Sequence, residues 1–488
     1  MEKYIFDKNK LPMPVLKNHK DWEDIYYYAW ELAFKNVDYI QKENWKPQLT
    51  CMPGINIVWQ WDSCIMTFIT NYSNGTLDAF NNLDNLYRLR REEDGFMAMA
   101  YYVDTETEAY PGRINPPLMA WAEWEHFLVT GDSSRFVQVL PALEGLFSFI
   151  ENNRRRNCGL YWFEDPGSSG MDNSPRGGYE IETLNGSDVC FIDLACQQAM
   201  SAKYISLMSE HINELDKAEF YRSEYERICS LINKYHWSDK AGFYFDFFAR
   251  DSKEKRVKLI NTKTAAAFWT LVSGVAEDGK KRSVIDHMFN PDEFYTPIPF
   301  ASLSRDDLNY DKNGGYWLGS VWAPTNFAAI RGLCECGYEE LARESAIKYL
   351  NAICEVNKNP LFGSIWEAYA PEELRPATTE AGDVCRMDFV GWSGIAPITL
   401  LIENIIGLRF NAKTNTIHFS VPREECGLKN MQFNGSMVSV ECTKYQNFRG
   451  KTEISVTTEK PFTLSVRVNY LFEDVIIHVP TGEHVFMI

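Results

Sequence analysis

The sequence predicts a mainly α-helical protein that ends in a small β-sheet domain. Apolar residues recur at steps of three and four over most of the chain up to Gly407, and after it they alternate with polar residues. Long loops rich in tryptophan and glycine separate the helical segments, which indicates that the helical part carries the functional site. With 488 residues, 45% of them hydrophobic, the chain is long enough for one large domain with an appendage.

The helical segments follow from their apolar spacing. In the clearest one, apolar residues step by four, three, four and three from Tyr221 to Tyr235. Asn115 and Pro116 supply a cap and a first turn in front of another. The same spacing predicts helices over residues 21–40, 80–90, 118–129, 140–152, 192–212, 264–276, 322–334, 339–356 and 392–406.

The helices arrive in pairs, which is typical of stacked helical hairpins. A closed (α/α)6 toroid of six hairpins is the most economical arrangement, and a straight solenoid is the alternative. The sequence has no repeat at a fixed period, which favours the toroid. We assign residues 1–407 to this helical domain.

The C-terminal segment, residues 408–488, is predicted to form a small antiparallel β-sandwich. Turn signals such as Asn434-Gly435 and Thr481-Gly482 separate short runs with a period of two. The segment has no cluster of chemically reactive residues, so we expect it to cap the helical domain. The predicted strands cover residues 416–421, 438–440, 453–457, 464–468 and 475–479.

Composition excludes several classes of function. A formal net charge of −18 disfavours nucleic acid and anionic membrane surfaces as partners. Neither a signal peptide nor a long apolar run is present, and the 12 cysteines show no CxxC pair, so we expect a cytoplasmic protein with reduced thiols. We expect neither a metal nor a cofactor, because phosphate-binding, dinucleotide-binding and zinc-binding motifs are missing. The sequence leaves open whether the protein forms a homo-oligomer.

Carboxylates in aromatic surroundings are the strongest candidates for chemistry. Hydrolysis of a glycosidic bond needs one protonated and one ionised carboxyl group. Asp172, on a turn-forming stretch, suits the acid, and Glu367, next to Trp366, suits the base. Asp62, next to Trp61, is a third candidate, better suited to hold sugar hydroxyls. For each carboxylate, a structural hydrogen bond or a helix cap is the alternative.

Five short blocks stand out in the helical part: 61–63, 170–176, 315–326, 366–369 and 389–393. In this order they resemble blocks of glycoside hydrolase family 63, which includes processing α-glucosidase I and the bacterial mannosylglycerate and glucosylglycerate hydrolases and is akin to trehalase. The run Gly-Met-Asp-Asn-Ser-Pro-Arg at 170–176 is the most specific of them.

The resemblance implies an (α/α)6 toroid and an inverting exo-acting hydrolase that needs no cofactor. It implies that Asp172 is the general acid and Glu367 the general base, about 6.5 to 9.5 Å apart, and that the substrate is a small oligosaccharide or glycoside, with an α-glucoside as first candidate. The residues implied to bind the sugar are Trp61, Asp62, Trp317, Trp322 and Trp392, with Arg176 and Tyr316 near them and Gln60 and Asn173 as weaker candidates.

One position departs from the family pattern. Leu318 stands where the family usually has arginine, which argues against a glycerate-type substrate, because leucine cannot replace a guanidinium fork. Two other functions remain as alternatives. A sugar epimerase or isomerase would need convergent histidines, for which His126 and His287 are the candidates, and a non-catalytic carbohydrate-binding protein would have Glu367 turned away from Asp172.

Overall fold

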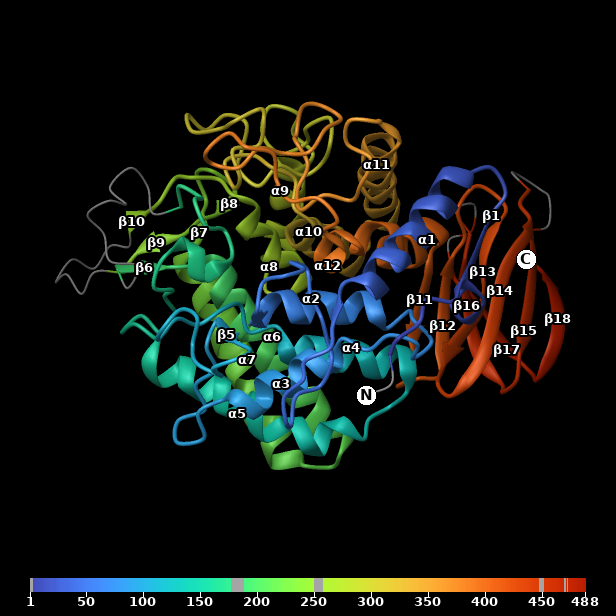
Figure 1. Cartoon of the computed structure of the whole chain (residues 1–488), viewed down its shortest axis with the longest axis horizontal. Helices are drawn as coiled ribbons and strands as arrows, with labels where there is room; N and C mark the ends of the chain where they lie inside the picture. The colour runs from blue at the N-terminus through green and yellow to red at the C-terminus, as the bar shows by residue number, and fades with distance from the viewer. Residues whose placement is uncertain (1–2, 177–187, 250–257, 447–451, 469–470, 472) are drawn as a thin grey trace.

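The computed structural model describes residues 3–176, 188–249, 258–446, 452–468, 471 and 473–488. Helices dominate up to residue 406 and strands dominate after it (Figure 1). The helices are α1 (Lys20–Lys35), α2 (Gln60–Thr70), α3 (Phe80–Leu89), α4 (Met119–Thr130), α5 (Arg135–Asn153), α6 (Ile192–His211), α7 (Leu215–Tyr235), α8 (Trp269–Val272), α9 (Asp278–Met288), α10 (Ala323–Glu335), α11 (Glu339–Lys358), α12 (Val390–Ser393) and the π-helix η6 (Ile395–Ile406).

Six helices contact one another in cyclic order. The contacts run from α2 to α4, α6, α8, α10 and η6 in turn, and η6 contacts α2 again. Every residue of α2 and of η6 is buried, whereas only four residues of α7 are buried. Helices that are apolar all round belong inside a protein and helices with one apolar face belong outside. The six helices therefore form the inner layer, and α7 packs on α6 from outside.

The predicted helices are confirmed in outline, with four differences. Helix α9 was not among the predicted segments. The stretch expected as a loop around Trp61 is the first turn of α2. The segment 264–276 contains only a 3-10 helix, Ala265–Phe268, followed by the single turn of α8. The first predicted helix ends at Lys35 rather than residue 40, because Asn36 terminates α1 and its side-chain amide donates to the carbonyl oxygen of Asp388.

The C-terminal strands form two sheets. The four-stranded sheet has the order β11 (Leu408–Asn411), β12 (Thr416–Ser420), β16 (Phe462–Arg467) and β17 (Val475–Val479). The five-stranded sheet has the order β1 (Met13–Leu16), β13 (Cys426–Phe433), β14 (Ser436–Lys444), β15 (Glu453–Thr458) and β18 (Gly482–Met487).

Two features of these sheets correct the predictions. The N-terminal strand β1 pairs antiparallel with β13, so the C-terminal sheets include residues that we assigned to the helical domain (Figure 1). The pair β12 and β16 is parallel, so the strands are not all antiparallel. Chain order could not reveal either feature, because both pairings join segments that are distant in sequence.

Short strands lie between the helices and fasten the loops at the edge of the inner layer. The short strands are β2 (Val37–Asp38), β3 (Gln48–Leu49), β4 (Ile57–Trp59), β5 (Ala100–Tyr102), β6 (Val189–Cys190), β7 (Trp237–Ser238), β8 (Phe243–Tyr244), β9 (Phe247–Phe248) and β10 (Lys258–Leu259).

Among the residues that the structure describes, no helix combines the length and the apolar character needed to cross a membrane.

Candidate active site

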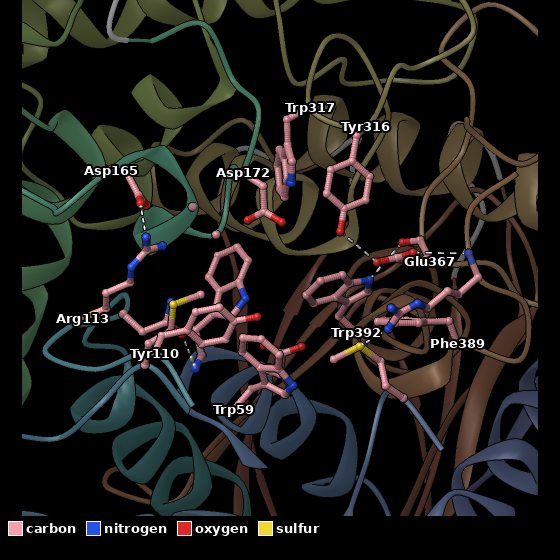
Figure 2. A pocket seen from close by; sticks show the side chains of 18 residues that line it. Trp59, Tyr110, Arg113, Asp165, Asp172, Tyr316, Trp317, Glu367, Phe389 and Trp392 are labelled. Carbon is pink, nitrogen blue, oxygen red and sulfur yellow. Dashed lines mark hydrogen bonds and ion pairs between the residues drawn. The ribbon is translucent and has the colours of Figure 1, made fainter. Parts of the chain in front are cut away.

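A cavity of about 510 Å³ lies among the loops that precede the inner helices (Figure 2). This volume lies within the range of small-molecule sites. Its walls combine seven aromatic side chains with four carboxyl groups and two guanidinium groups. The lining residues are Met52, Trp59, Trp61, Asp62, Met99, Tyr110, Arg113, Asn115, Asp165, Gly167, Gly170, Asp172, Tyr316, Trp317, Glu367, Arg386, Phe389 and Trp392.

Asp172 is held in the cavity by a short, tightly turned loop. The loop starts with the 3-10 helix Pro166–Ser169, which Asp165 caps by accepting a hydrogen bond from the backbone NH of Ser168 at 2.9 Å. Gly170 follows with φ of 80°, and its Cα faces the ring of Trp61 so closely that a Cβ would lie 2.7 Å from a ring carbon. Glycine at this position lets the loop lie against the tryptophan.

The carboxyl group of Asp172 has a strongly perturbed pKa. The residue is exposed and lines the cavity, and desolvation is the main cause that raises its pKa to about 7. The negative charges of Glu367 and Asp62 raise the pKa further, while the guanidinium of Arg113 lowers it. Asp172 can therefore carry a proton near neutral pH.

Glu367 is buried and firmly held. Its backbone NH donates to the carbonyl oxygen of Arg386 at 2.9 Å, and its own carbonyl accepts from the Trp392 indole at 2.9 Å. The carboxylate accepts from the Tyr316 hydroxyl at 3.3 Å and from the Arg386 backbone NH at 3.2 Å. Burial raises the pKa of Glu367, and these two donors lower it by stabilising the ionised form.

Asp62 lies at the third position of α2 and is also buried. The thiol of Cys51 donates to its carboxylate at 3.0 Å. Desolvation raises the pKa of Asp62 to about 6, with an added contribution from the charge of Glu367. Three carboxyl groups thus share one cavity and influence one another's ionisation.

Stacked and edge-on indoles form the rigid wall of the cavity. Trp317 stacks on Trp322 with ring centroids 4.2 Å apart and an interplanar angle of 3°. Trp392 meets Trp61 and Trp322 edge to face, at 6.0 and 5.6 Å. Aromatic faces held in this way can stack on the apolar face of a sugar ring and also exclude water from the carboxyl groups.

Comparisons with known proteins assign the chain that forms this cavity to a protein family. The model of the mannosylglycerate hydrolase MGH1-like glycoside hydrolase domain matches residues 58–381, which contain both Asp172 and Glu367. The chain belongs to this glycoside hydrolase family. The resemblance to family 63 is thereby confirmed, and the matched residues include most of the cavity lining.

Two proteins and one solved structure are similar to this chain. An uncharacterized protein of Borreliella burgdorferi is 28% identical over 424 residues, with 84% of each chain covered. The mannosyl-oligosaccharide glucosidase of Saccharomyces cerevisiae is 21% identical over 324 residues, which cover 63% of this chain and 37% of the yeast protein. The crystal structure of the mannosylglycerate hydrolase of Thermus thermophilus in complex with glucose shares the fold, with a TM-score of 0.61, 17% identity, and 76% of this chain and 98% of that chain covered.

Seven of the residues predicted for the site line the cavity of this MGH1-like glycoside hydrolase. They reach it from segments that are far apart in sequence, and Figure 2 shows the labelled ones converging on one space. The seven are Trp61, Asp62, Asp172, Tyr316, Trp317, Glu367 and Trp392.

Arg176 is a correction, because the structure contradicts its predicted contact with substrate. The side chain is fully buried, forms ion pairs with Asp193 at 2.6 Å and Asp246 at 2.9 Å, and donates to the Ser169 hydroxyl at 3.1 Å. Ser169 belongs to the loop that carries Asp172, whereas Asp193 lies on α6 and Asp246 lies between β8 and β9. Arg176 therefore anchors this loop and has no donor left for a sugar.

Three further residues predicted to bind substrate do not line the cavity either. The amide of Asn173 donates to the Gly315 carbonyl at 2.9 Å and accepts from the Trp317 NH at 2.8 Å, so it ties two loops together. Trp322 is buried behind Trp317, and Gln60 is fully buried at the start of α2. These residues support the wall, and a sequence motif cannot distinguish support from contact.

Leu318 also lies outside the cavity lining, with a half-buried side chain.

Several residues of this MGH1-like site were not predicted from the sequence. Asn115, read as a helix cap, accepts from the Trp61 NH at 3.0 Å and donates to the Ser168 carbonyl at 3.0 Å, so it joins α2 to the loop of Asp172. The pair Arg113 and Asp165 had no local signal, because the two residues meet only in the folded chain.

The two alternative functions lose support. Among the described residues that line the cavity, none is a histidine. His126 bonds to Asn71 at 2.9 Å in a different cavity, and His287 pairs with Glu293 beside α9. The geometry thus offers no histidine pair for epimerisation, and Glu367 does face the cavity that Asp172 lines.

Proposed function

We propose that this glycoside hydrolase removes a terminal sugar from a small α-glycoside with inversion of configuration, and that an α-glucoside is the first substrate to test. Asp172 acts as general acid and Glu367 as general base. The observation that carries the proposal is the pair of carboxyl groups in one aromatic cavity with opposite hydrogen-bond environments.

The assignment of acid and base follows from these environments. Glu367 accepts two hydrogen bonds, which favour its ionised form, whereas among the described residues none donates to the carboxyl group of Asp172. Desolvation, and after it the charge of ionised Glu367, raise the pKa of Asp172 to about 7. Glu367 therefore loses its proton first, and Asp172 keeps the proton that the leaving oxygen needs.

In the proposed reaction, Asp172 donates its proton to the glycosidic oxygen as the bond to the anomeric carbon breaks. A water molecule attacks this carbon from the opposite face and loses a proton to Glu367. The aromatic walls exclude other water, and Asp62 accepts a hydrogen bond from a sugar hydroxyl. We expect a separation of about 6.5 to 9.5 Å between the two carboxyl groups, which leaves room for the water.

We also infer that the inner and outer helices close into an (α/α)6 toroid capped by a β-sandwich. The cyclic order of contacts from α2 to η6 and back supports the toroid, and the two C-terminal sheets support the sandwich. The 12 free cysteines support a cytoplasmic location.

The test is a panel of α- and β-glucosides, mannosides and glycosyl glycerates, assayed for released monosaccharide, followed by NMR of the first-formed product. We expect release from an α-glycoside, with the β-anomer appearing first. Initial release of the α-anomer would overturn the inverting mechanism.

Variants test the two roles. Asp172→Asn and Glu367→Gln should each lower kcat about 10²-fold or more without lowering the melting temperature, because both side chains act on the reacting atoms. Asp216→Asn and Glu373→Gln, at exposed positions on α7 and on a surface loop, are the matched controls and should retain full activity. Near-normal turnover in either active-site variant would remove that residue from its role.

A further inference from the structure

We propose that the leaving-group side of the cavity selects a neutral, polyhydroxylated leaving group through the Arg113–Asp165 ion pair, and discriminates against a leaving group that bears a carboxylate. The inference rests on the proposed role of Asp172 as general acid, and it names the substrate class more narrowly than that role does.

The position of the leaving group follows from the position of the acid. In an inverting hydrolase the acid stands beside the leaving oxygen, and the base stands on the opposite face of the sugar. Figure 2 shows Asp165, Arg113 and Tyr110 on the side of Asp172 that faces away from Glu367. The part of the substrate that leaves must therefore lie against these three residues.

Three polar groups converge at this end of the cavity around Gly167. A Cβ placed on Gly167 would lie 3.2 Å from Asp165 Oδ1, 3.8 Å from Arg113 Nη1 and 3.8 Å from Asp172 Oδ1. The absence of a side chain at Gly167 keeps this space open beside the proton of Asp172. A group that occupies it meets a cation, an anion and the acid at once.

Arg113 is already neutralised by a partner of its own. Its Nη2 lies 2.7 Å from Asp165 Oδ2, and the two side chains are equally exposed, at 36% each. The other oxygen of Asp165 is occupied by the backbone NH of Ser168, so the carboxylate cannot turn away. A carboxylate on the substrate would have to compete with Asp165 for the guanidinium. A hydroxyl group can instead accept from Arg113 and donate to Asp165.

The charges of the cavity lining also disfavour an anionic leaving group. Four carboxyl groups and two guanidinium groups line the cavity. Arg386 supplies the second cation; its backbone NH bonds to Glu367, and its guanidinium contacts the sulfur of Met52. Within the described lining, Arg113 is the cation that acts on Asp172, and Asp165 already neutralises it.

Aromatic rings complete the proposed subsite. Trp59 and Tyr110 both line the cavity, with ring centroids 5.4 Å apart and an interplanar angle of 39°. The guanidinium of Arg113 lies 5.8 Å from the Tyr110 ring centroid. Aromatic carbon next to a donor and an acceptor suits the alternating CH and OH groups of a sugar or polyol.

The first experiment compares two substrates that differ in one group. α-Glucosylglycerol and α-glucosylglycerate share the sugar and the linkage, and only the second has a carboxylate. We expect the wild-type kcat/KM to be about tenfold higher for glucosylglycerol, because the carboxylate faces Asp165 without a free cation. An equal or higher kcat/KM for glucosylglycerate would overturn the proposal.

The second experiment reverses the preference. Asp165→Asn keeps an oxygen that can cap Ser168 and frees Arg113, so the ratio of the two kcat/KM values should shift about tenfold toward glucosylglycerate. Asp474→Asn removes the partner of Arg467 on the β-sheet side and is the matched control, with an unchanged ratio. If Asp165→Asn does not fold, Arg113→Gln should lower kcat/KM for glucosylglycerol about tenfold. An unchanged ratio, or an unchanged kcat/KM for Arg113→Gln, would contradict the proposal.

4-Nitrophenyl α-glucoside separates this proposal from the proposed function. Its leaving group needs neither a proton nor hydrogen bonds, so Asp165→Asn and Arg113→Gln should lower its hydrolysis less than they lower that of glucosylglycerol. If it is cleaved but glucosylglycerol is not preferred, only the leaving-group inference fails. If none of the three α-glucosides is cleaved, α-glucoside hydrolysis itself is wrong.

Discussion

The hydrogen bond from Tyr316 to Glu367 allows a sharp test of how this site controls its protonation. The change is Tyr316→Phe, which removes only the hydroxyl group. The ring keeps its edge-on contact with Trp322 at 4.9 Å, and the backbone carbonyl still accepts from the Trp322 indole at 3.2 Å. Glu367 retains its second donor, the Arg386 NH.

The magnitude follows from the geometry. Hydrogen bonds to charged groups contribute roughly 1.5 to 3 kcal/mol, and a length of 3.3 Å places this one at or below the low end, about 1 kcal/mol. Because the bond favours ionised Glu367, its loss should raise the pKa of Glu367 by roughly 0.7 of a pH unit. The acidic limb of the kcat/KM profile should move to higher pH by the same amount.

The assay is a pH profile of kcat/KM, which reports the free enzyme. The alkaline limb, set by the proton of Asp172 with a pKa of about 7, should move less than the acidic limb. Tyr310→Phe is the matched control, because Tyr310 donates to Glu372 at 2.8 Å outside the cavity. An unmoved acidic limb, or a larger shift of the alkaline limb, would refute the assignment of Glu367 as base.

Three further predictions concern the supports of the site. The raised pKa of Asp62 means that the native state binds more protons than the unfolded state between about pH 4 and 6, so wild-type stability falls as pH rises through that window. Relative to wild type, Asp62→Asn should gain up to roughly 3 kcal/mol in the free energy of unfolding across this window. Melting curves at several pH values measure this gain, and a stability difference that does not change with pH would refute the prediction. Arg176→Met leaves its two aspartates unpaired in the interior and should lower the free energy of unfolding by roughly 3 to 5 kcal/mol, measured by denaturant titration; a loss near zero would be incompatible with an anchoring role. Gly170→Ala should lower kcat about tenfold or more, because the added Cβ pushes the loop away from Trp61. Gly337 has a similar φ of 81° with open space around it, so Gly337→Ala should leave kcat unchanged. Equal losses of kcat in the two variants would mean that backbone strain alone is responsible.

The secondary structure of the helical part could largely be predicted, and its failures have physical causes. Outer helices such as α7 show a clear apolar stripe because one face meets water. The buried helix α2 has no such contrast, since all of its residues are buried, and the block around Trp61 was therefore mistaken for a loop. The parallel pair β12 and β16 and the strand β1 depend on long-range pairing, which leaves no local pattern.

The candidate site divides in the same way. The specific run at 170–176 and the aromatic surroundings of Glu367 singled out both carboxylates without any coordinates. The same motif could not tell Asp172, which faces the cavity, from Arg176 four residues later, which is buried behind it. Neighbours in a motif share a loop, but the side of the loop that each one faces is decided by packing.

The sequence alone determined the family and the mainly helical architecture with its C-terminal strands, and it singled out two candidate carboxyl groups, because apolar periodicity and rare local strings are properties of adjacent residues. Only the tertiary structure decided which side chains reach the cavity, that burial raises the pKa of both Asp172 and Glu367, and that Arg113 and Asp165 meet beside Asp172. Desolvation and ion pairing depend on distances between segments far apart in the chain, and such distances exist only once the chain has folded.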